Sequence, residues 1–283
     1  MLSNRFNCPY IVTLHENPPW LEELLSNKAS KILDSLICSD LITRPNSIDI
    51  IDLFKFDIDE NRIIYLPNFV DDKSFPLATK EIKEANKELL NVKNKTIILN
   101  VASLEKIKGQ SLLINAFSII KEKMPNTELW IIGAGSEEAN LRKLALEKDV
   151  YENVKFLGRV RNEEIYKYIS CADMFAMPSI SESFGISQVE AMLCGVPVVA
   201  TNNFGSEEII IEGINGFLCR SRNEKDFASL IEKSLSTNFN PEQIRKTAVE
   251  RYGRVTSYKN ILEAYRRAIL NHKNQSVNQH SVD

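Results

Sequence analysis

Residues 95–135 read KTIILNVASLEKIKGQSLLINAFSIIKEKMPNTELWIIGAG. Two short apolar runs, Lys95–Ala102 and Glu128–Ile132, enclose a segment, Gly109–Lys123, whose apolar residues recur every three or four positions. A continuous apolar run predicts a strand that is buried on both faces, and the three-to-four spacing predicts an amphipathic helix. This stretch therefore predicts a β-α-β unit with parallel strands.

The same alternation continues towards the C-terminus. Further strands are predicted at Asn153–Leu157, Met174–Met177 and Pro197–Thr201, and helices at Glu137–Leu146, Asn162–Ala172 and Ile186–Leu193. Right-handed crossovers join such units into one sheet with helices on both faces. We therefore expect an α/β fold with a complete doubly wound parallel-sheet, Rossmann-like domain over residues 95–250.

The first 75 residues show a sparser pattern. Strands are predicted at Tyr10–Leu14, Leu41–Thr43 and Arg62–Leu66, with a helix at Leu21–Leu36. Three strands do not complete an α/β domain, so residues 1–75 are expected to form a partial N-terminal α/β domain.

The remaining segments are expected to connect and finish these domains. Residues 76–94 are rich in Lys, Glu and Asn and are predicted to be a linker. A helix is predicted at Pro241–Arg251, and a C-terminal helix over residues 251–272. The polar residues 273–283 are predicted to be a disordered tail.

Composition excludes several classes of protein. Of the 283 residues, 43% are hydrophobic and 26% are charged, which allows a buried core. The 35 basic and 38 acidic residues give a net charge of −3, so no basic field is available to attract nucleic acid. No apolar run reaches the roughly 18 residues of a membrane span, and the start lacks a signal-peptide pattern. A cytoplasmic protein is expected.

Metal and disulfide sites are not predicted either. The five cysteines are widely spaced without a C-x-x-C pair, and two of the three histidines lie near the C-terminus. Asp57 and Asp59 resemble a D-x-D metal motif but lie in a run of charged residues, which favours a solvated loop.

Two loops after predicted strands carry candidate ligand contacts. Gly133 and Gly135 end a strand, and the following helix N-terminus favours an anion. The pair also fits a tight turn in which Ser136 caps the helix, and the dinucleotide pattern G-x-G-x-x-G is incomplete. Lys108 opens the helix at Gly109, where the helix dipole disfavours a cation unless an anionic ligand binds there.

The segment Ser181–Glu190 holds two further candidates. Glu182 lies in the loop before the predicted helix at Ile186, and Glu190 lies about one turn inside it. At the C-terminal edge of a parallel sheet, both carboxylates and the first helix amides can face one crevice. Hydroxyls would suit the carboxylates and phosphates the amides, as in a nucleotide-sugar. A solvated loop with a helix-capping acid explains the same residues equally well.

Taken together, the motifs resemble the retaining glycosyltransferases of family 4, the group 1 transferases, which have the GT-B fold. The matching segments are His15 in IVTLHE, Asn68 in IYLPNFVD, Lys108-Gly109 in VASLEKIKG, IIGAGSE at 131–137, FLGRV at 156–160, Glu182 with Glu190, AMLCGVPVVAT at 191–201, and Glu208 in EEIIIEGINGF. They follow the family's order and cover almost the whole chain.

The resemblance implies a role for each matching residue. Catalytic roles fall to Glu182, which would contact the transferred sugar, to Lys108, which would bind the donor diphosphate, and to His15 from the other domain. Donor-binding roles fall to Ser103, Lys108, Gly133, Gly135, Arg159, Val160, Glu182, Phe184, Gly185, Ile186 and Glu190, with Glu190 on the ribose. The donor would be a UDP-, GDP- or ADP-sugar, and neither a metal nor a cofactor is implied.

This sequence departs from the family pattern at three places. Ser103 stands where the family has an Arg, which removes one phosphate contact or leaves it to Lys106. Phe204-Gly205 replaces the usual Gly-Gly. About the first hundred residues of a usual N-terminal domain have no counterpart, an estimate from domain sizes.

Three functions fit these residues. The first is a retaining glycosyltransferase acting on an acceptor that the residues do not identify. The second is a nucleotide-sugar binding module or partner subunit without turnover, and the third is a GT-B nucleotide-sugar epimerase or phosphorylase. Peripheral contact with the inner face of a membrane and a partner polypeptide stay open, although the amphipathic Leu21–Leu36 fits core packing better.

Overall fold

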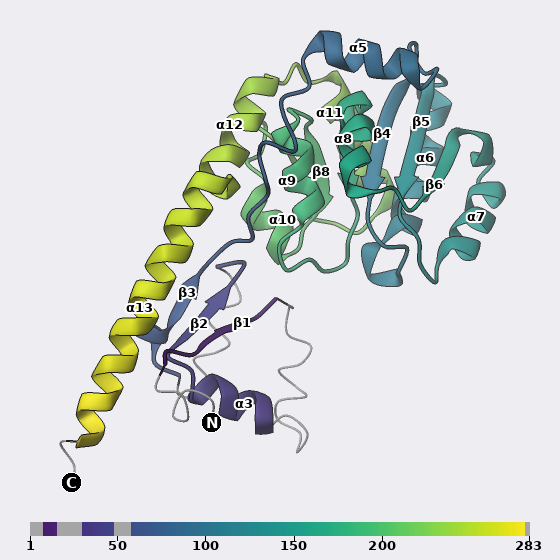
Figure 1. Cartoon of the computed structure of the whole chain (residues 1–283). Helices are drawn as coiled ribbons and strands as arrows, with labels where there is room; N and C mark the ends of the chain where they lie inside the picture. Colours follow the sequence, from purple (N-terminus) through teal and green to yellow (C-terminus); the bar gives the residue numbers. More distant parts are fainter. Residues whose placement is uncertain (1–7, 16–29, 48–57, 281–283) are drawn as a thin grey trace. The chain divides into compact units, whose positions relative to one another are not determined.

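The structure is a computed structural model that describes residues 8–15, 30–47 and 58–280 (Figure 1). The chain divides into two compact units. The larger unit is Val70–Gly253, and the smaller unit combines Met1–Phe69 with Arg254–Asp283.

The larger unit is built on a six-stranded parallel sheet of order β6-β5-β4-β7-β8-β9. Its strands are β4 (Thr96–Val101), β5 (Thr127–Ile132), β6 (Val154–Gly158), β7 (Met174–Met177), β8 (Val198–Thr201) and β9 (Gly216–Cys219). The chain adds β5 and β6 on one side of β4, then returns to place β7 on the other side. The strand order therefore reverses between β4 and β7, and such a topological switch point is where sheets of this kind bind ligands.

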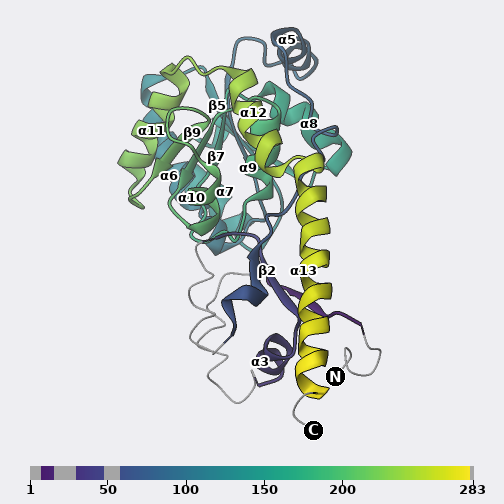
Figure 2. The ribbon, with the colours of Figure 1, turned by 90° about the vertical axis from the view of Figure 1, so that its left-hand side faces the viewer.

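Helices cover both faces of this sheet, as expected for a doubly wound fold. They are α5 (Lys80–Leu89), α6 (Gln110–Lys123), α7 (Glu138–Glu147), α8 (Asn162–Cys171), α9 (Ile186–Leu193), α10 (Phe204–Ile209), α11 (Glu224–Ser236) and α12 (Pro241–Tyr252). Figure 2 shows α6 and α11 on one side of the sheet and α8, α9 and α12 on the other. The predicted α/β fold with a Rossmann-like domain is confirmed.

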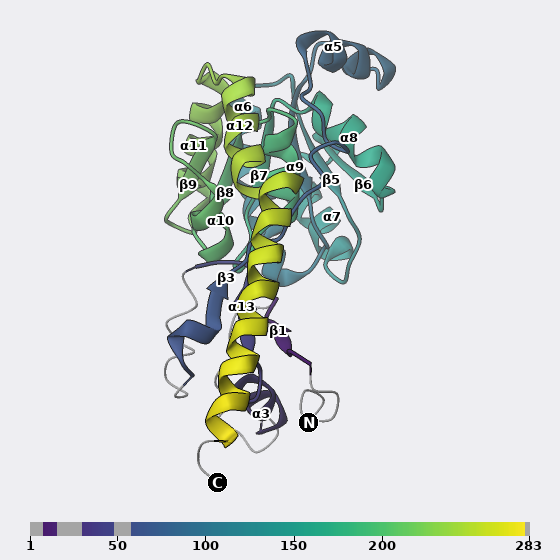
Figure 3. The same ribbon diagram turned by 60° about the vertical axis from the view of Figure 1, so that its left-hand side comes forward.

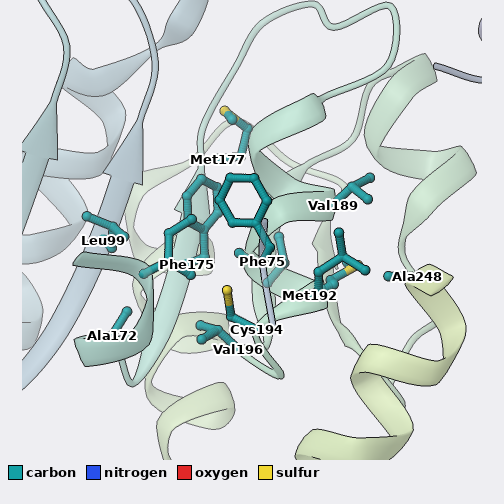
Figure 4. Packing of buried hydrophobic residues seen from close by; sticks show 14 of the residues in the cluster. Phe75, Leu99, Ala172, Phe175, Met177, Val189, Met192, Cys194, Val196 and Ala248 are labelled. Carbon is teal, nitrogen blue, oxygen red and sulfur yellow. The ribbon is translucent and has the colours of Figure 1, made fainter. Parts of the chain in front are cut away.

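Two buried clusters follow the alternation of side chains along each strand. Ile97 and Leu99 of β4 belong to the cluster beneath α8, α9 and α12, whereas Ile98 belongs to the cluster beneath α6 and α11. Figure 4 shows the first cluster, in which Phe175 of β7 and Met192 of α9 lie together. Since both sheet faces are buried, the strands read as continuous apolar runs.

The predicted linker at residues 76–94 is wrong over residues 80–89, which form α5. This helix packs on α8, and its Lys83 and Lys87 make ion pairs of 2.8 and 2.7 Å with Asp173. Thr79 accepts a hydrogen bond from the backbone N–H of Ile82 and so caps the helix. Lysine stems cover apolar surface, which explains how a charged segment can pack as a helix.

Besides α5, three helices and strands of the larger unit were not predicted from the sequence. They are β9, α10 and α11. A four-residue apolar segment such as β9 gives little periodic signal, and its position becomes clear only from its pairing with β8.

The smaller unit contains three parallel strands in the order β1-β2-β3. They are β1 (Ile11–Thr13), β2 (Leu41–Arg44) and β3 (Ile63–Tyr65), and α3 (Ser30–Ile37) leads into β2. All three strands were predicted, and the described part of α3 overlaps the helix predicted at Leu21–Leu36. Its residues 21–29 lie outside the described part of the chain.

The C-terminal helix α13 (Arg254–His280) packs along this small sheet (Figure 3). Ala264 and Ala268 are buried in one cluster with Leu41, and the ring of His272 lies 3.2 Å from a carboxylate oxygen of Asp40. The helix is longer than the predicted residues 251–272. Residues 273–280 are helical and were wrongly predicted to be disordered, because Lys, Asn and Gln are compatible with a helix and no Gly or Pro interrupts it.

The Asp173 carboxylate provides a test of the α5 packing. Burial raises its pKa, but the nearby ammonium groups of Lys83 and Lys87 lower the pKa below its usual value overall. The Asp173→Asn variant should lose about 2–4 kcal/mol of unfolding free energy, since Lys87 would stay largely buried without its charge partner. Urea denaturation measures this loss.

Glu147→Gln is the matched control, because Glu147 pairs with Lys143 on the exposed surface of α7. Its expected loss is below about 0.5 kcal/mol. Equal losses in both variants would contradict the view that α5 is an integral part of the unit.

Candidate functional site

The candidate site lies where the loops after β4 and β7 meet. The N–H of Ile180 donates to the carbonyl of Ile107 at 2.7 Å, which ties the two loops together. Gly109 has a φ of +67°, and a Cβ there would lie 2.2 Å from the Pro178 carbonyl oxygen. Only glycine permits this approach, which sets Lys108 opposite the β7 loop.

Lys108 and Glu182, both predicted as catalytic, are brought together by this contact. The Lys108 Nζ lies 2.7 Å from Oε1 of Glu182, and the side chains are 24% and 11% exposed. Ser179 Oγ donates to the same oxygen at 2.9 Å. Among the described residues, no hydrogen bond to Oε2 of Glu182 is formed. That oxygen is available to a ligand.

Side chains from the end of β8 hold the β7 loop. Thr201 Oγ1 and Asn203 Nδ2 donate to the carbonyl of Ser179 at 2.5 and 3.2 Å. The Arg222 guanidinium donates to the carbonyl of Ile180. The sequence analysis did not identify Thr201, Asn203 and Arg222 as site residues. The only signal in the sequence was their position at or just after the ends of the strands β8 and β9.

The N-terminus of α9 faces the same edge of the sheet. Gly185 precedes it with a φ of +97°, and no side chain caps the helix. The first amides of a helix have no acceptor within it, so those of α9 can bind an anion. Phe184 is only 2% exposed and packs edge-on against Tyr252, so its side chain belongs to the core and its predicted backbone contact with the donor stays a prediction.

Glu190 lies on the accessible side of α9. It follows Ile186 by one helical turn, and Ile186 is 47% exposed, whereas Val189, Ala191 and Met192 are buried. No described residue forms a hydrogen bond or ion pair with its carboxylate. Burial raises the pKa of Glu190 from 4.5 to about 7. An unpartnered, desolvated carboxylate of this kind is typical of ligand sites.

Gly133 and Gly135 allow two loops to approach closely. A Cβ on Gly133 would lie 1.9 Å from the Ala102 carbonyl oxygen, and one on Gly135 would lie 2.4 Å from that of Leu104. The pair therefore allows the loops after β4 and β5 to pack backbone against backbone. Their predicted role in donor binding stays a prediction.

The loop before α7 is tied to the loop after β4 by Glu105. Glu105 accepts hydrogen bonds from the N–H of Ser136 at 3.1 Å and from its Oγ at 2.6 Å. These bonds lower the pKa of Glu105. No side chain caps α7 itself, so an anion at this helix end stays a prediction.

The other candidate donor contacts lie on the exposed loops. Ser103 is exposed, and its carbonyl accepts a hydrogen bond of 2.9 Å from Gln110 Nε2, while Lys106 is exposed in the same loop. Arg159 is exposed and Val160 is half-buried after β6, two strands away from β4. Their predicted roles stay predictions.

His15 follows β1 in the smaller unit, where it is exposed. Asp59 accepts a hydrogen bond of 2.9 Å from the N–H of Asn61 in a short capped turn, and Asp57 lies outside the described residues. Within residues 8–15, 30–47 and 58–280, no group of three or more His, Cys, Asp or Glu side chains could hold a metal ion. No helix in that part of the chain is long and apolar enough to cross a membrane.

Comparison with known proteins gives a consistent result. Residues 81–251 match the family model described as glycosyl transferases group 1. A mannosyltransferase of Corynebacterium glutamicum, named as GDP-mannose-dependent and acting on a monoacylated phosphatidylinositol monomannoside, is 38% identical over 154 residues, 52% of this chain and 40% of its own length. A D-inositol 3-phosphate glycosyltransferase of Paenarthrobacter aurescens is 29% identical over 75% of this chain and 53% of its own length. The chain thus spans about half of each relative.

Solved structures share the fold. HepE of Anabaena, in complex with UDP and glucose, superposes with a TM-score of 0.79 and 23% identity, covering 92% of this chain and 72% of that one. Sucrose-phosphate synthase of Thermosynechococcus elongatus gives a TM-score of 0.80 at 21% identity, covering 95% and 70%. Both likenesses show the GT-B fold expected from the sequence.

The raised pKa of Glu190 predicts how stability depends on pH. Since the folded protein binds this proton more tightly than the unfolded chain, wild-type stability should fall as pH rises from about 5 to 8. The side chain introduced by Glu190→Gln does not titrate. The unfolding free energy of this variant relative to wild type should therefore increase over that pH range, by about 2–3 kcal/mol. Urea denaturation at several pH values measures it, with Glu147→Gln as control. A constant difference would show that the carboxylate is not desolvated.

Proposed function

The chain belongs to the group 1 glycosyl transferases, since their family model matches residues 81–251 of its 283, and we propose that it transfers a sugar from a nucleotide-sugar donor to an acceptor. The observation that carries this proposal is the convergence of Lys108, Glu182 and the α9 N-terminus at the switch point of the sheet. It supports a ligand that combines phosphates with hydroxyl groups.

In this proposal the diphosphate of the donor binds Lys108 and the first amides of α9. The leaving nucleoside diphosphate gains negative charge as the sugar bond breaks, so a cation and a positive helix end stabilise the transition state. The ammonium group of Lys108 donates a hydrogen bond to Glu182, and the diphosphate competes with Glu182 for this group.

The two carboxylates take the hydroxyl groups. Oε2 of Glu182, which has no partner among the described residues, accepts from the transferred sugar, and Glu190 accepts from the ribose. A hydroxyl that binds the ionised carboxylate lowers the raised pKa of Glu190. Donor binding is therefore expected to release a proton near neutral pH.

Retention of configuration, a metal-free reaction and a role for His15 at the reacting centre complete the proposal. They rest on the sequence motifs rather than on the geometry.

A second candidate is a nucleotide-sugar binding module that requires another polypeptide for turnover. Donor binding without sugar release, and turnover only when a second polypeptide is added, would support it over the first.

Calorimetric titration with UDP-glucose, GDP-mannose and ADP-glucose tests the proposal. At least one donor should bind, and the free nucleoside diphosphate should inhibit this binding. Hydrolysis of the bound donor, followed by product analysis, distinguishes an enzyme from a binding module. If none of the donors and none of the nucleoside diphosphates binds, the proposed function is wrong.

Removal of the Lys108 charge should weaken the phosphate contact directly. The Lys108→Met variant is expected to raise the Kd of the nucleoside diphosphate by about 10- to 100-fold, because a charged hydrogen bond contributes roughly 1.5–3 kcal/mol. Lys143→Met is the control, since Lys143 is an exposed lysine on α7. The same Kd in both variants would contradict the assignment of Lys108.

A further inference from the structure

Ser179 lies two residues after the end of β7 and was not predicted as part of the site. We infer that Ser179 is a positioning residue, which orients Glu182 so that one carboxylate oxygen is held by the protein and the other faces the sugar of the donor. This inference rests on the proposed function, and it names a residue that acts through Glu182 rather than on the substrate.

The first observation is that both intramolecular bonds of Glu182 go to a single oxygen. Ser179 Oγ and Lys108 Nζ lie 2.9 and 2.7 Å from Oε1, while Oε2 has no partner among the described residues. A carboxylate offers about four acceptor positions over its two oxygens. Two donors on one oxygen therefore fix the plane of the group and leave the second oxygen accessible.

The second observation is that Ser179 is itself held in place. It is 0% exposed, and its carbonyl accepts from Thr201 Oγ1 and Asn203 Nδ2. The hydroxyl must act as donor towards Glu182, because an ionised carboxylate only accepts. Thr201 and Asn203, at the end of β8, thus hold the backbone of Ser179 in place, and the hydroxyl of Ser179 orients the carboxylate of Glu182.

The two donors differ once the nucleotide-sugar binds. The side chain of Lys108 is partly exposed, and its ammonium group binds the diphosphate of the donor. Its hydrogen bond to Glu182 is therefore weaker when the donor is bound. Ser179 is fully buried and meets no ligand, so its bond persists. In the loaded site, Ser179 is therefore the remaining protein group that keeps Oε2 of Glu182 directed at the sugar.

A purely structural serine would explain the burial but not the pattern of acceptors. Such a residue would stabilise the β7 loop, and its loss would weaken every ligand of the site to the same extent. A positioning residue affects only the ligand groups that contact Glu182. The two roles therefore predict different changes in affinity: a structural role weakens nucleoside diphosphate and nucleotide-sugar equally, and a positioning role weakens the nucleotide-sugar alone.

The test compares wild type, Ser179→Ala, Glu182→Ala and the double variant by calorimetry. The probes are UDP with UDP-glucose, and GDP with GDP-mannose. Ser179→Ala should raise the Kd of the nucleotide-sugar about fivefold to twentyfold and change the Kd of the nucleoside diphosphate by less than about twofold, the loss of one hydrogen bond to a charged group. In the Glu182→Ala background, Ser179→Ala should have no further effect.

Ser170→Ala is the matched control. Ser170 is also a fully buried serine in the larger unit, and its Oγ donates to the carbonyl of Lys167 at 2.9 Å in α8. It should lower the melting temperature as Ser179→Ala does, without changing either Kd. An effect of Ser179→Ala that is equal for nucleotide and nucleotide-sugar, or that persists beside Glu182→Ala, would overturn the inference.

A crystal structure of ligand-free Ser179→Ala decides the question without any ligand. The Glu182 carboxylate should turn so that Oε2 is no longer the free oxygen. If Lys108 alone keeps the wild-type orientation, the inference is wrong. This result is independent of the titrations, in which a wild-type protein that binds none of the probes would contradict the proposed function instead.

Discussion

The contact between the loops after β4 and β7 is the constraint on which the site depends. It joins residues 74 positions apart in the sequence, Lys108 and Glu182, and it exists because parallel strands β4 and β7 are neighbours. The space is so narrow that a Cβ at Gly109 would overlap the carbonyl of Pro178. A larger residue at 109 would separate the loops, and the ammonium and carboxylate with them.

Other glycines at this edge of the sheet also lie where two backbone segments approach closely. Gly133 and Gly135 let the β5 loop lie on the β4 loop, and Gly205 lets α10 approach the backbone of Phe184. Glu105 accepts hydrogen bonds from Ser136 in the loop before α7, and no side chain caps the N-terminus of α9. The first amides of α9 therefore have no side-chain acceptor from the protein.

The parts that could be predicted from the sequence are those with a local physical cause. Strands such as β4 and β5 are buried on both faces, so their apolar runs are visible without a structure. Lys108 was found because the helix dipole disfavours a cation at a helix start, and Glu182 was found from its spacing to Glu190 around a predicted helix start. Ser179 and Thr201 were not found, because their role comes from the bond between them, and only the order β7-β8 brings them together. The helix α5 was missed for a similar reason, since Lys87 becomes buried only beside Asp173.

The charges of Lys108, Glu182 and Glu190 nearly balance one another in the structure. Lys108 and Glu182 neutralise one another at 2.7 Å, and burial keeps the pKa of Glu190 at about 7, so its carboxylate carries only part of a charge at neutral pH. Under the proposed function, a diphosphate would therefore meet little repulsion from these two acidic residues. Its competition for Lys108 would leave the charge of Glu182 for a sugar hydroxyl, and a ribose hydroxyl bound to Glu190 would favour loss of its proton. Phosphate binding would thus be coupled to recognition of the sugar.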